Sequence, residues 1–575
     1  MNVTSSSSVP HDTAGLAPLA MLSPWSGVIL GCVFHISTQS IELDHHGWLL
    51  TAMFNGLILT VAVLQSRFSQ LGLIAAALRA VFFSWATLLG LFSSIIFQRL
   101  FLSPLRKYPG PFLAKITKFY TMVLQVRSGN LLYKDIRKMH EEYGDIVRTG
   151  PRELSILKPS AIPLIYGAKS KCTKSTFYSQ VKVYAEEDHN VFTLRNHQEH
   201  AWRRRKMDRG LSIKALNSYE PRVRAKVDLL LDQLSARQGQ PVNTTDWMSF
   251  FSFDAMGDLV YGRDFKMLAK GHGTIESDDG KEAKISHMHS ALKMVGVLSS
   301  VPWMIRMLAQ TEMAGDYVIF RNWCKDKMRE KQAAWHPDQV PTDIASHLIT
   351  ARETSEPAQH QTQTSLDEDS VMLIVAGSDT TSGALGNVMY YLTKHQHVYR
   401  KLQALVDEAF PNGDADWSYE EARKITYIDH VCNESMRLKT PALQGLVREV
   451  PAGGLQIEDE HIPAGTIVSV PTWSLYHDPR VWEDPDTYKP ERFEGVDVNS
   501  ENVPFLPFLR GAYACPGKNL AYMEMRSVLS RLALRFDLAF APGETGVAFD
   551  EGPMDTFTML LPPLHLVLTE RKKGD

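Results

Sequence analysis

The sequence predicts a mainly helical body with a minor β-rich part, preceded by membrane-spanning helices. Apolar residues recur at helical spacing through much of residues 130–350, as in VRAKVDLLLDQL at 223–234. Short strand-like runs occur in the C-terminal third, GTIVSV at 465–470 and LHLVL at 564–568. The N-terminal part differs from both, because it contains long apolar stretches almost free of charge. Helices are therefore expected to dominate, with a small sheet.

Two apolar stretches in the N-terminal part are each about long enough to cross a bilayer core, which takes roughly 20 residues per helix. Residues 47–64 carry no charge, and residues 72–97 carry only Arg79. A third stretch, residues 17–36, is interrupted by Pro24 and two serines, so it is either a third span, a re-entrant segment or a signal-like segment. The expected anchor has two or three spans. The alternative is a buried hydrophobic hairpin in a soluble protein.

Basic side chains beside the last span indicate how the chain is oriented. Arg99, Arg106 and Lys107 follow it, and such residues mark the cytosolic side of a span. We therefore expect residues 1–100 to form a membrane anchor and residues 101–575 to form a cytosolic catalytic domain. The expected membrane is that of the endoplasmic reticulum.

Composition excludes several classes of protein. A chain of 575 residues with 44% hydrophobic and 22% charged residues can bury a large core, so it is not globally disordered. Its formal net charge of −3 lacks the basic excess that nucleic-acid binding requires, so no nucleic-acid partner is expected. The cysteines are too few and too widely spaced for a disulfide framework or paired zinc ligands, which favours a reducing compartment. They are Cys32, Cys172, Cys324, Cys432 and Cys515.

Three segments are expected to lack regular structure. SPLRKYPGPF at 103–112 contains three prolines, which stiffen the backbone and end helices, so it is expected to form a hinge after the last span. Residues 269–284 and 353–369 are polar and lack helical periodicity. Both are expected to be surface loops.

One cysteine stands in a setting that favours an ionised sulfur. In FLRGAYACPGKNLAYMEMR, Cys515 lies between Gly511 and Gly517, which allow close backbone approach and unusual dihedral angles. Pro516 precedes a helix that is expected to begin near Lys518. Backbone N–H groups and the positive dipole at a helix start stabilise a thiolate. The alternative is an inert core residue, which is the commoner role of a lone cysteine.

The spacing around this cysteine resembles the haem-binding loop of cytochromes P450, F-x-x-G-x-R-x-C-x-G. Phe508, Gly511, Cys515 and Gly517 occupy its fixed positions. The resemblance implies haem b (iron protoporphyrin IX) with the Cys515 thiolate as axial ligand of the iron, and a ring from Phe508 packed beside the sulfur to limit water. Tyr513 stands where the family has an arginine that contacts a haem propionate. A phenol hydroxyl there can still donate one hydrogen bond.

A second motif shared with that family is AGSDTT, residues 376–381, inside an apolar stretch expected to form a helix of about seven turns. Ser365 and Glu368 are expected to form a capping box at its start. The small Ala376 and Gly377 would let a flat cofactor lie against the helix.

Asp379 and Thr380 are polar residues within this apolar helix, where they cost free energy unless they are satisfied. One interpretation is a packing notch in which a hydroxyl bonds to its own helical turn. The other, which the P450 resemblance supports, is a proton-delivery pair beside bound dioxygen. Asp379 and Thr380 are therefore the predicted catalytic residues.

A third motif is NESMRLKTP, where Glu434 and Arg437 are three residues apart on one helix face before Pro441 ends the helix. Alone, such a pair is common and usually solvated. In the P450 family an arginine at the position of Arg492, within DPDTYKPERF, joins the pair in a buried triad. The resemblance thus implies a structural triad that braces the cysteine loop rather than a chemical site.

The basic run EHAWRRRKMDRGLS permits two alignments with the family's W-x-x-x-R motif, Trp202 with Lys206 or His200 with Arg204. The second is preferred because it places the following Leu-Ser pair where family members usually have a small or aromatic pair. By resemblance, His200 and Arg204 are then propionate ligands, and Arg448 in LQGLVREVP matches a third such position. Two buried carboxylates need such cations.

The resemblance covers roughly residues 104–570 and implies the mostly helical P450 fold. It also implies a reaction in which NADPH-cytochrome P450 reductase delivers two electrons from NADPH and one oxygen atom of dioxygen enters a substrate. YGDIVRTGPRELSI at 143–156 and PLRKYPGPFLAK are further similar to membrane-bound fungal P450s of secondary metabolism.

The expected substrate is a lipophilic small molecule, because the segments expected to contact it are mostly apolar. These are residues 175–192, which include Phe177 and Tyr178, the helix before Asp379, and residues 440–447. A terpenoid, a polyketide and a prenylated alkaloid all remain open, and the expected role is an oxidative tailoring step.

Two other functions share part of the pattern. A haem-thiolate isomerase or dehydratase of peroxides would need no reductase, but relatives of that kind generally lack the acid and the alcohol that Asp379 and Thr380 supply. A non-enzymatic membrane haem protein would need neither a proton relay nor an apolar pocket above the iron.

Overall fold

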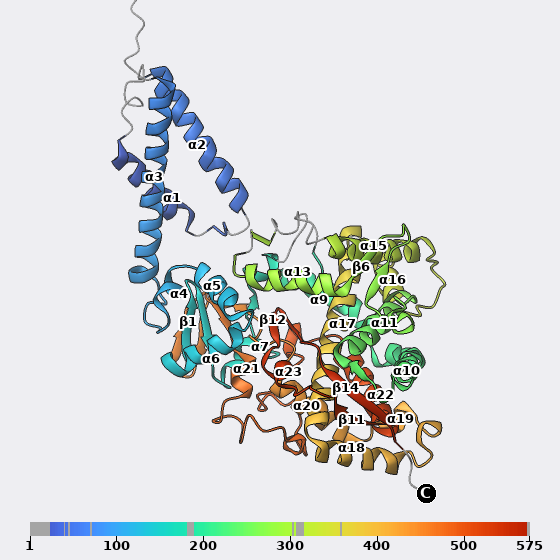
Figure 1. The fold of residues 1–575 in the computed structure, drawn as a ribbon. Coiled ribbons are helices and arrows are strands. Elements are labelled where there is room, and N and C mark those ends of the chain that lie inside the picture. Colours follow the sequence, from blue (N-terminus) through green and yellow to red (C-terminus); the bar gives the residue numbers. More distant parts are fainter. Residues whose placement is uncertain are drawn as a thin grey trace, which may run out of the picture. The chain divides into compact units, whose positions relative to one another are not determined.

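The chain separates into two compact units, Met1–Lys107 and Tyr108–Asp575. Each unit is described by itself, and both are drawn in Figure 1. The computed structural model describes residues 23–39, 41–43, 46–68, 72–180, 189–301, 304–305, 315–356 and 359–571.

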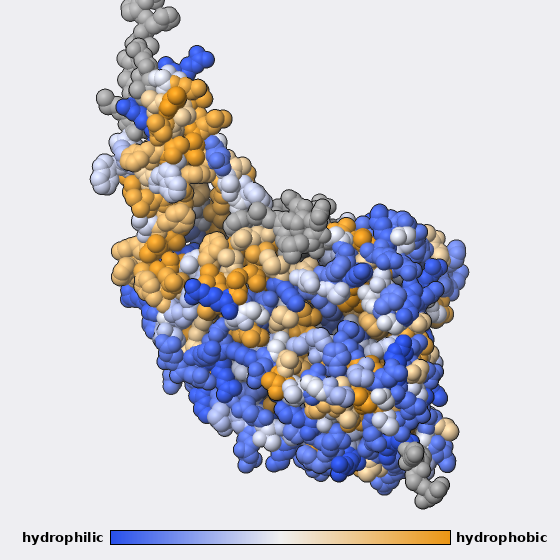
Figure 2. All heavy atoms as spheres, in the orientation of Figure 1, coloured by the Kyte–Doolittle hydropathy of each residue, from blue (hydrophilic) through white to orange (hydrophobic). Residues whose placement is uncertain are grey.

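The described part of the N-terminal unit is helical: α1 (Pro24–Thr38), α2 (Gly47–Phe68), α3 (Leu73–Phe97) and the π-helical turn η2 (Gln98–Leu102). The surface of these helices is mainly apolar (Figure 2), with exposed tryptophans, leucines and isoleucines. Two stretches have the length and composition of membrane spans, Gly47–Arg67 and Leu73–Leu102. They coincide with the two spans expected from the sequence.

The third candidate span is shorter than expected. Its described part is α1, whose 15 residues extend for about 22 Å, less than the roughly 30 Å of a bilayer core. Residues 17–22 lie outside the described residues. α1 packs closely along α3, where a side chain on Gly31 or Gly90 would overlap the opposing backbone. Small residues at such contacts are typical of helix packing within membranes.

Helices dominate the body, and the longest, α17 (Gln363–Lys394), runs through its middle (Figure 1). α17 packs against α11, α15, α20 and α22, so most of its side chains are buried. The helices of the described body are α4 (Phe112–Ile116), α5 (Phe119–Ser128), α6 (Leu132–Tyr143), α7 (Ala161–Tyr166), α8 (Thr176–Gln180), α9 (His197–Gly210), α10 (Ile213–Ser235), α11 (Thr244–Tyr261), α12 (Met267–Lys270), α13 (Ile285–Leu298), α15 (Gly315–Ala333), α16 (Ile344–Glu353), α17, α18 (Gln396–Ala409), α19 (Tyr419–Ala422), α20 (Thr426–Leu438), α21 (Thr472–Tyr476), α22 (Lys518–Arg535) and α23 (Val547–Glu551), with 3-10 turns η5 (Gly413–Ala415), η6 (Pro490–Phe493) and η7 (Gly511–Tyr513).

The strands are short and form small sheets, as expected. The largest sheet has the order β1-β2-β10-β7-β3, in which β10 runs parallel to β2 and the other neighbours are antiparallel. In its β3–β7 pair, Lys174 lies directly opposite Arg448. The strands are β1 (Ile146–Gly150), β2 (Glu153–Ile156), β3 (Thr173–Lys174), β4 (Pro241–Asn243), β5 (Thr274–Glu276), β6 (Glu282–Lys284), β7 (Arg448–Glu449), β8 (Leu455–Ile457), β9 (Glu460–Ile462), β10 (Ile467–Ser469), β11 (Phe536–Phe540), β12 (Met554–Thr556), β13 (Thr558–Leu560) and β14 (His565–Glu570).

The two polar segments are more ordered than the sequence predicted. Residues 269–284 contain the β5–β6 hairpin, because Ile275 and Ala283 pair across it and both are buried. In the second segment, residues 353–369, α17 already begins at Gln363. The prediction of a surface loop was therefore wrong for the hairpin, while the C-terminal part of the second segment belongs to the helix that was expected to begin near Ser365.

Glu434, Arg437 and Arg492 form a buried ion-paired network. The Glu434 carboxylate accepts from Arg437 Nε at 2.7 Å and from Arg492 Nε at 3.0 Å. Arg437 also donates to the Tyr476 carbonyl at 2.6 Å, and the Tyr476 hydroxyl accepts from the backbone N–H of Leu506 at 2.6 Å. The network therefore connects α20 to the segment that leads into the cysteine loop.

Replacing Glu434 by Gln is expected to destabilise the body by about 3–5 kcal/mol, because two buried guanidinium groups lose their counter-charge. The midpoint of urea unfolding measures the change. Glu491→Gln is the matched control, since Glu491 lies on the neighbouring η6 turn, is partly exposed and pairs with Lys401. That variant is expected to lose no more than about 1 kcal/mol. Equal midpoints for the two variants would contradict a bracing role for the network.

Candidate active site

Cys515 lies in the turn between η7 and α22, and α22 begins at Lys518, as expected. The Cys515 N–H donates to the Phe508 carbonyl at 2.8 Å. Burial raises the pKa of the Cys515 thiol, while backbone N–H groups of Gly517 and Lys518 and the charge of Arg204 oppose that rise. The residue is exposed by surface area although protein atoms enclose it, which is the geometry of a side chain that faces an internal space.

The two glycines of the loop have different roles. Gly511 has φ of 65°, and a Cβ there would lie 2.5 Å from the Gly167 carbonyl oxygen, so only glycine fits. Gly517 has an ordinary φ of −82° and is the N-cap residue of α22. A Cβ there would meet only the Cys515 sulfur, at 3.8 Å. The prediction that Gly517 supplies an unusual dihedral was therefore wrong.

Phe508 contributes to the loop through its backbone and through ring packing. Its carbonyl accepts the Cys515 N–H, and its ring packs against Tyr522 of α22 with centroids 5.3 Å apart. That contact anchors the loop on the helix that follows it.

Four basic side chains and Tyr513 gather beside the cysteine loop. His200 and Arg204 come from α9, and Lys174 and Arg448 come from the β3–β7 pair. The Tyr513 ring lies 4.8 Å from the His200 ring, 4.8 Å from the Arg448 guanidinium and 5.0 Å from Lys174 Nζ. Lys174 was not predicted, and a single lysine in a short strand gives no signal in the sequence.

This cluster has excess positive charge. Burial, followed by the charges of Arg448 and Arg204, lowers the pKa of Lys174 to about 6. Burial and the charge of Lys174 likewise lower the pKa of His200 to about 3. Among the described residues neither Lys174 nor Arg448 pairs with a carboxylate, and Arg448 Nε is buried without a hydrogen-bond partner. Together with the sulfur, the cluster fits a group that carries two carboxylates, as haem does.

Arg204 also supports the cysteine loop directly. Its Nη1 donates to the carbonyl of Ala514 at 2.5 Å, and its Nε pairs with Asp208 at 2.7 Å. Trp202 and Lys206 stack on each other instead, with Lys206 Nζ 4.5 Å from the Trp202 ring. Within α9 it is therefore His200 and Arg204 that lie toward the loop.

The start of α17 and the role of Gly377 differ from expectation. Thr362 is the N-cap residue and accepts from the Ser365 N–H at 3.1 Å, whereas Glu368 pairs with Arg321 and Lys325 of α15. The capping box predicted at Ser365 and Glu368 was wrong, because a hydroxyl three residues earlier caps the helix.

The missing side chain of Gly377 makes room for Met256 of α11, which a Cβ would approach to 2.5 Å. Gly377 thus allows close helix packing, a role that was not predicted for it, and its contact with a flat cofactor stays a prediction. Ala376, in contrast, is exposed although α17 is mostly buried.

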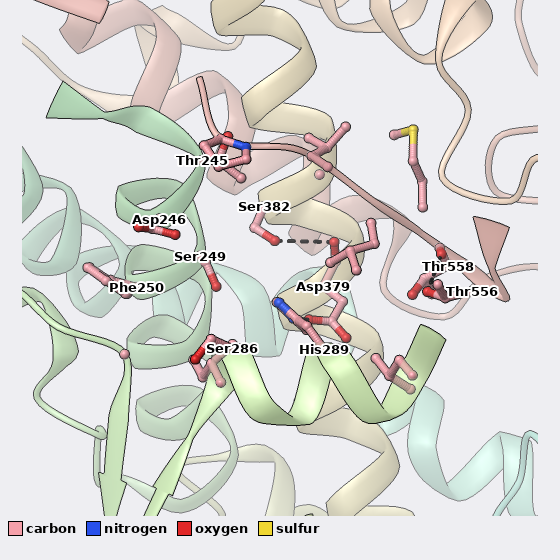
Figure 3. A pocket seen from close by; sticks show the side chains of 18 of the residues that line it. Thr245, Asp246, Ser249, Phe250, Ser286, His289, Asp379, Ser382, Thr556 and Thr558 are labelled. Atoms are coloured by element: carbon pink, nitrogen blue, oxygen red, sulfur yellow. Dashed lines mark hydrogen bonds and ion pairs between the residues drawn. The ribbon is translucent and has the colours of Figure 1, made fainter. Parts of the chain in front are cut away.

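Asp379 and Thr380 have different partners. The Thr380 hydroxyl donates to the Ala376 carbonyl at 2.7 Å, which is the bond that the packing-notch interpretation requires. Asp379 Oδ1 lies 3.2 Å from His289 Nε2 of α13 (Figure 3). His289 could not be predicted from the sequence, because the contact joins two helices that are distant in the chain.

Aromatic side chains and a second carboxyl group complete the surroundings. Phe177, Phe192 and Phe557 pack together, with Phe557 stacked on Phe177 at 5.7 Å. Tyr178 accepts from Arg448 Nη1 at 2.7 Å and so belongs to the basic cluster. Glu524 of α22 is buried beside Thr381, and burial raises its pKa to about 8.

Part of the expected substrate segment, residues 181–188, lies outside the described residues. In the part of the chain that is described, no group of three or more histidine, cysteine or carboxylate side chains is arranged to hold a bare metal ion.

Comparisons with known proteins agree with this arrangement. The family model described as Cytochrome P450 matches residues 111–568. The chain is 34% identical over 487 residues to "Cytochrome P450 monooxygenase orf5" of Eupenicillium brefeldianum, covering 84% of this chain and 95% of that protein. It is 32% identical over 495 residues to "Tryprostatin B 6-hydroxylase" of Aspergillus fumigatus, covering 84% of each chain.

The fold is also that of a solved P450. The crystal structure of the cytochrome P450DA heme domain superposes with a TM-score of 0.62 at 17% identity, covering 77% of this chain and 93% of that one. The family match spans most of the body, and the relatives named above are fungal P450 monooxygenases. The chain therefore belongs to the cytochrome P450 family and is a P450 monooxygenase.

Proposed function

We propose that this enzyme binds haem b through Cys515 and inserts one oxygen atom from dioxygen into a lipophilic small molecule in a tailoring step of secondary metabolism. The observation that carries the haem assignment is the combination of an enclosed sulfur at a helix start with two buried cations, Lys174 and Arg448, that pair with no carboxylate among the described residues. Once bound, the haem supplies the redox chemistry of dioxygen reduction and oxygen transfer.

The residues around the haem would each have a separate task. Backbone N–H groups at the start of α22 hold the sulfur as a thiolate. Arg448, Lys174 and the α9 pair His200 and Arg204 bind the two propionates, and Tyr513 accepts the nearby cations on its ring face. The phenylalanine cluster that includes Phe557 excludes water from the substrate side.

Asp379 and Thr380 are proposed to move protons. Thr380 holds a proton on its hydroxyl oxygen, and Asp379, which reaches the neighbouring cavity, passes protons toward it. This acid and alcohol favour oxygen activation over a reductase-independent isomerase or dehydratase, and over a haem carrier that does no chemistry.

The proposed location is a membrane, with NADPH-cytochrome P450 reductase as electron donor and the body in the cytosol at the endoplasmic reticulum. Support comes from the two apolar N-terminal stretches and from exposed apolar side chains at the beginning of the body, Phe112, Leu113, Phe119 and Val126. The proposed domains are the anchor, residues 1–100, and the catalytic domain, residues 101–575.

The reaction is tested with purified enzyme, reductase and NADPH. Tryprostatin B, which the name of a relative specifies, is a first probe, and extracts of fungal metabolites widen the search. We expect a compound whose mass has increased by one oxygen atom, formed only when NADPH is present. Conversion without NADPH or reductase would support the isomerase or dehydratase instead.

In the same assay, Thr380→Ala is expected to keep consuming NADPH but to release more hydrogen peroxide and less product. Loss of one proton-delivery group typically slows such steps by about 10²-fold or more. Thr380→Ser keeps the hydroxyl and serves as the matched control. Equal product per NADPH in Thr380→Ala and the parent would support the packing-notch interpretation.

Cys515→Ala is expected to abolish the strongly red-shifted absorbance band that thiolate-ligated haem shows when it is reduced under carbon monoxide. Cys432→Ala is the control, because Cys432 is a fully buried core residue of α20. That variant should lose stability but keep the band. A band that persists in Cys515→Ala would mean that another side chain binds the iron.

The stability of haem-free protein is expected to rise with pH between about 6 and 10.5 through Lys174. In that interval the unfolded chain holds a proton on Lys174 that the folded haem-free body does not, so unfolding becomes less favourable as pH rises. Bound propionates would let folded Lys174 keep its proton and remove this dependence. Urea midpoints of haem-free and haem-loaded protein from pH 6.5 to 9.5 measure both slopes.

Lys174→Met tests whether Lys174 causes this pH dependence of stability. It should flatten the slope of the haem-free protein without changing that of the loaded protein. If parent and variant have the same slopes, Lys174 does not carry the uncompensated charge.

A further inference from the structure

The carboxylate proposed to deliver protons has a histidine as its partner. His289 Nε2 of α13 lies 3.2 Å from Asp379 Oδ1 of α17. The Asp379 side chain is 10% exposed and that of His289 is 24% exposed, so the carboxylate is the more enclosed member of the pair. Figure 3 shows the two side chains next to each other between α13 and α17.

The pair borders a cavity of about 350 Å³, which is large enough to hold several water molecules. Ser249 lines it, and its Oγ is buried without a hydrogen-bond partner among the described residues. The hydroxyl and carboxyl side chains that surround the cavity in Figure 3 are Thr245, Asp246, Ser249, Ser286, Thr556 and Thr558.

Helix geometry places Asp379 at the edge of this cavity. Successive residues of an α-helix are turned by about 100°, so Ser382 and Gly383 share a face with Asp379, and both line the cavity. Ala376 and Thr380 share the adjoining face, where Ala376 is exposed, and neither lines the cavity. Around the helix, Asp379 therefore lies between Ser382, which lines the cavity, and Thr380.

We propose that His289 is a positioning residue that holds Asp379 and returns protons to it from the cavity. The proposal rests on the role in proton delivery proposed above for Asp379. In the transfer, the N–H bond at His289 Nε2 breaks and an O–H bond forms at Asp379 Oδ1. After Asp379 has passed its proton toward Thr380, a cavity water reprotonates the imidazole. No electrons change hands, and the solvent supplies each proton.

The charged groups around His289 are few. Asp379 faces it from α17, and Asp246 of α11 and His272, from the segment before β5, line the same cavity. Burial raises the pKa of Asp246, while a hydrogen bond from Asn243 and the charge of His289 oppose that rise. Asp555 of β12 accepts from the Phe557 N–H, and Asp316 of α15 accepts from His287. Among the described residues, the ion-pair partner of His289 is Asp379.

The test uses the full-length holoenzyme with reductase and NADPH but without organic substrate, so the identity of the substrate is not needed. Consumption of one NADPH per dioxygen yields hydrogen peroxide, and consumption of two yields water, which requires further protons. Removing His289 should slow the water-forming branch by about tenfold, less than the roughly 10²–10⁴-fold cost of removing a general acid itself. NADPH, dioxygen and hydrogen peroxide are measured together.

His289→Asn is expected to raise the share of hydrogen peroxide. His289→Gln, which keeps an N–H donor but cannot return a proton, should hold Asp379 partly in place and give a share between those of the parent and His289→Asn. The matched control is His287→Asn, because His287 lies on the same helix but pairs with Asp316 at 2.9 Å. It should behave as the parent.

Each outcome decides between the hypotheses. A parental peroxide share in both His289→Asn and His289→Gln overturns the role of His289. Asp379→Asn shows whether the function proposed above for Asp379 fails as well. If this variant also has the peroxide share of the parent, Asp379 does not deliver protons at all. The carbon monoxide band shows whether the haem site of each variant is intact. If His289→Asn lacks the band, His289→Gln is compared with the parent in its place.

Discussion

Buried positive charge beside the cysteine loop is the constraint on which the site depends. Lys174 and Arg448 stand directly opposite each other on antiparallel strands, where like charges are destabilising. Both are also almost fully buried, so water cannot screen them. An anion bound between them would relieve this repulsion, which is why the pair is proposed to hold the carboxylates of the haem. Arg204 connects the basic cluster to the cysteine loop, since it donates to the Ala514 carbonyl next to Cys515.

α17 borders three environments within about two helical turns. Gly377 admits Met256 of α11, Ala376 is exposed on the face of Thr380, and Ser382 borders the cavity. Successive residues of an α-helix are turned by about 100° around its axis. Neighbouring residues of α17 can therefore face a packed helix, an open face and a cavity. The small residues of the motif are therefore not interchangeable, although the sequence presents them as one group.

Periodic segments and motif residues were predictable from the sequence, whereas long-range pairs were not. The long helix α10 and strands β10 and β14 follow from apolar spacing, and the Glu434 triad follows from a family pattern. The cap of α17 was misplaced because Thr362 competes with Ser365 for the same role. Lys174 and His289 were missed because their partners, Arg448 and Asp379, lie far away in the chain. Only the folded strands and helices bring them together.

The tyrosine at position 513 and the lysine at position 174 are best understood as parts of one arrangement. An arginine at 513 would add a third buried cation to the Lys174–Arg448 pair, at considerable electrostatic cost. A tyrosine ring instead presents its negative face to both cations, at 5.0 and 4.8 Å. The positive charge that the family pattern places on the loop is thus carried by the sheet. A departure from a motif can therefore conserve its electrostatics when a residue from another element provides the charge.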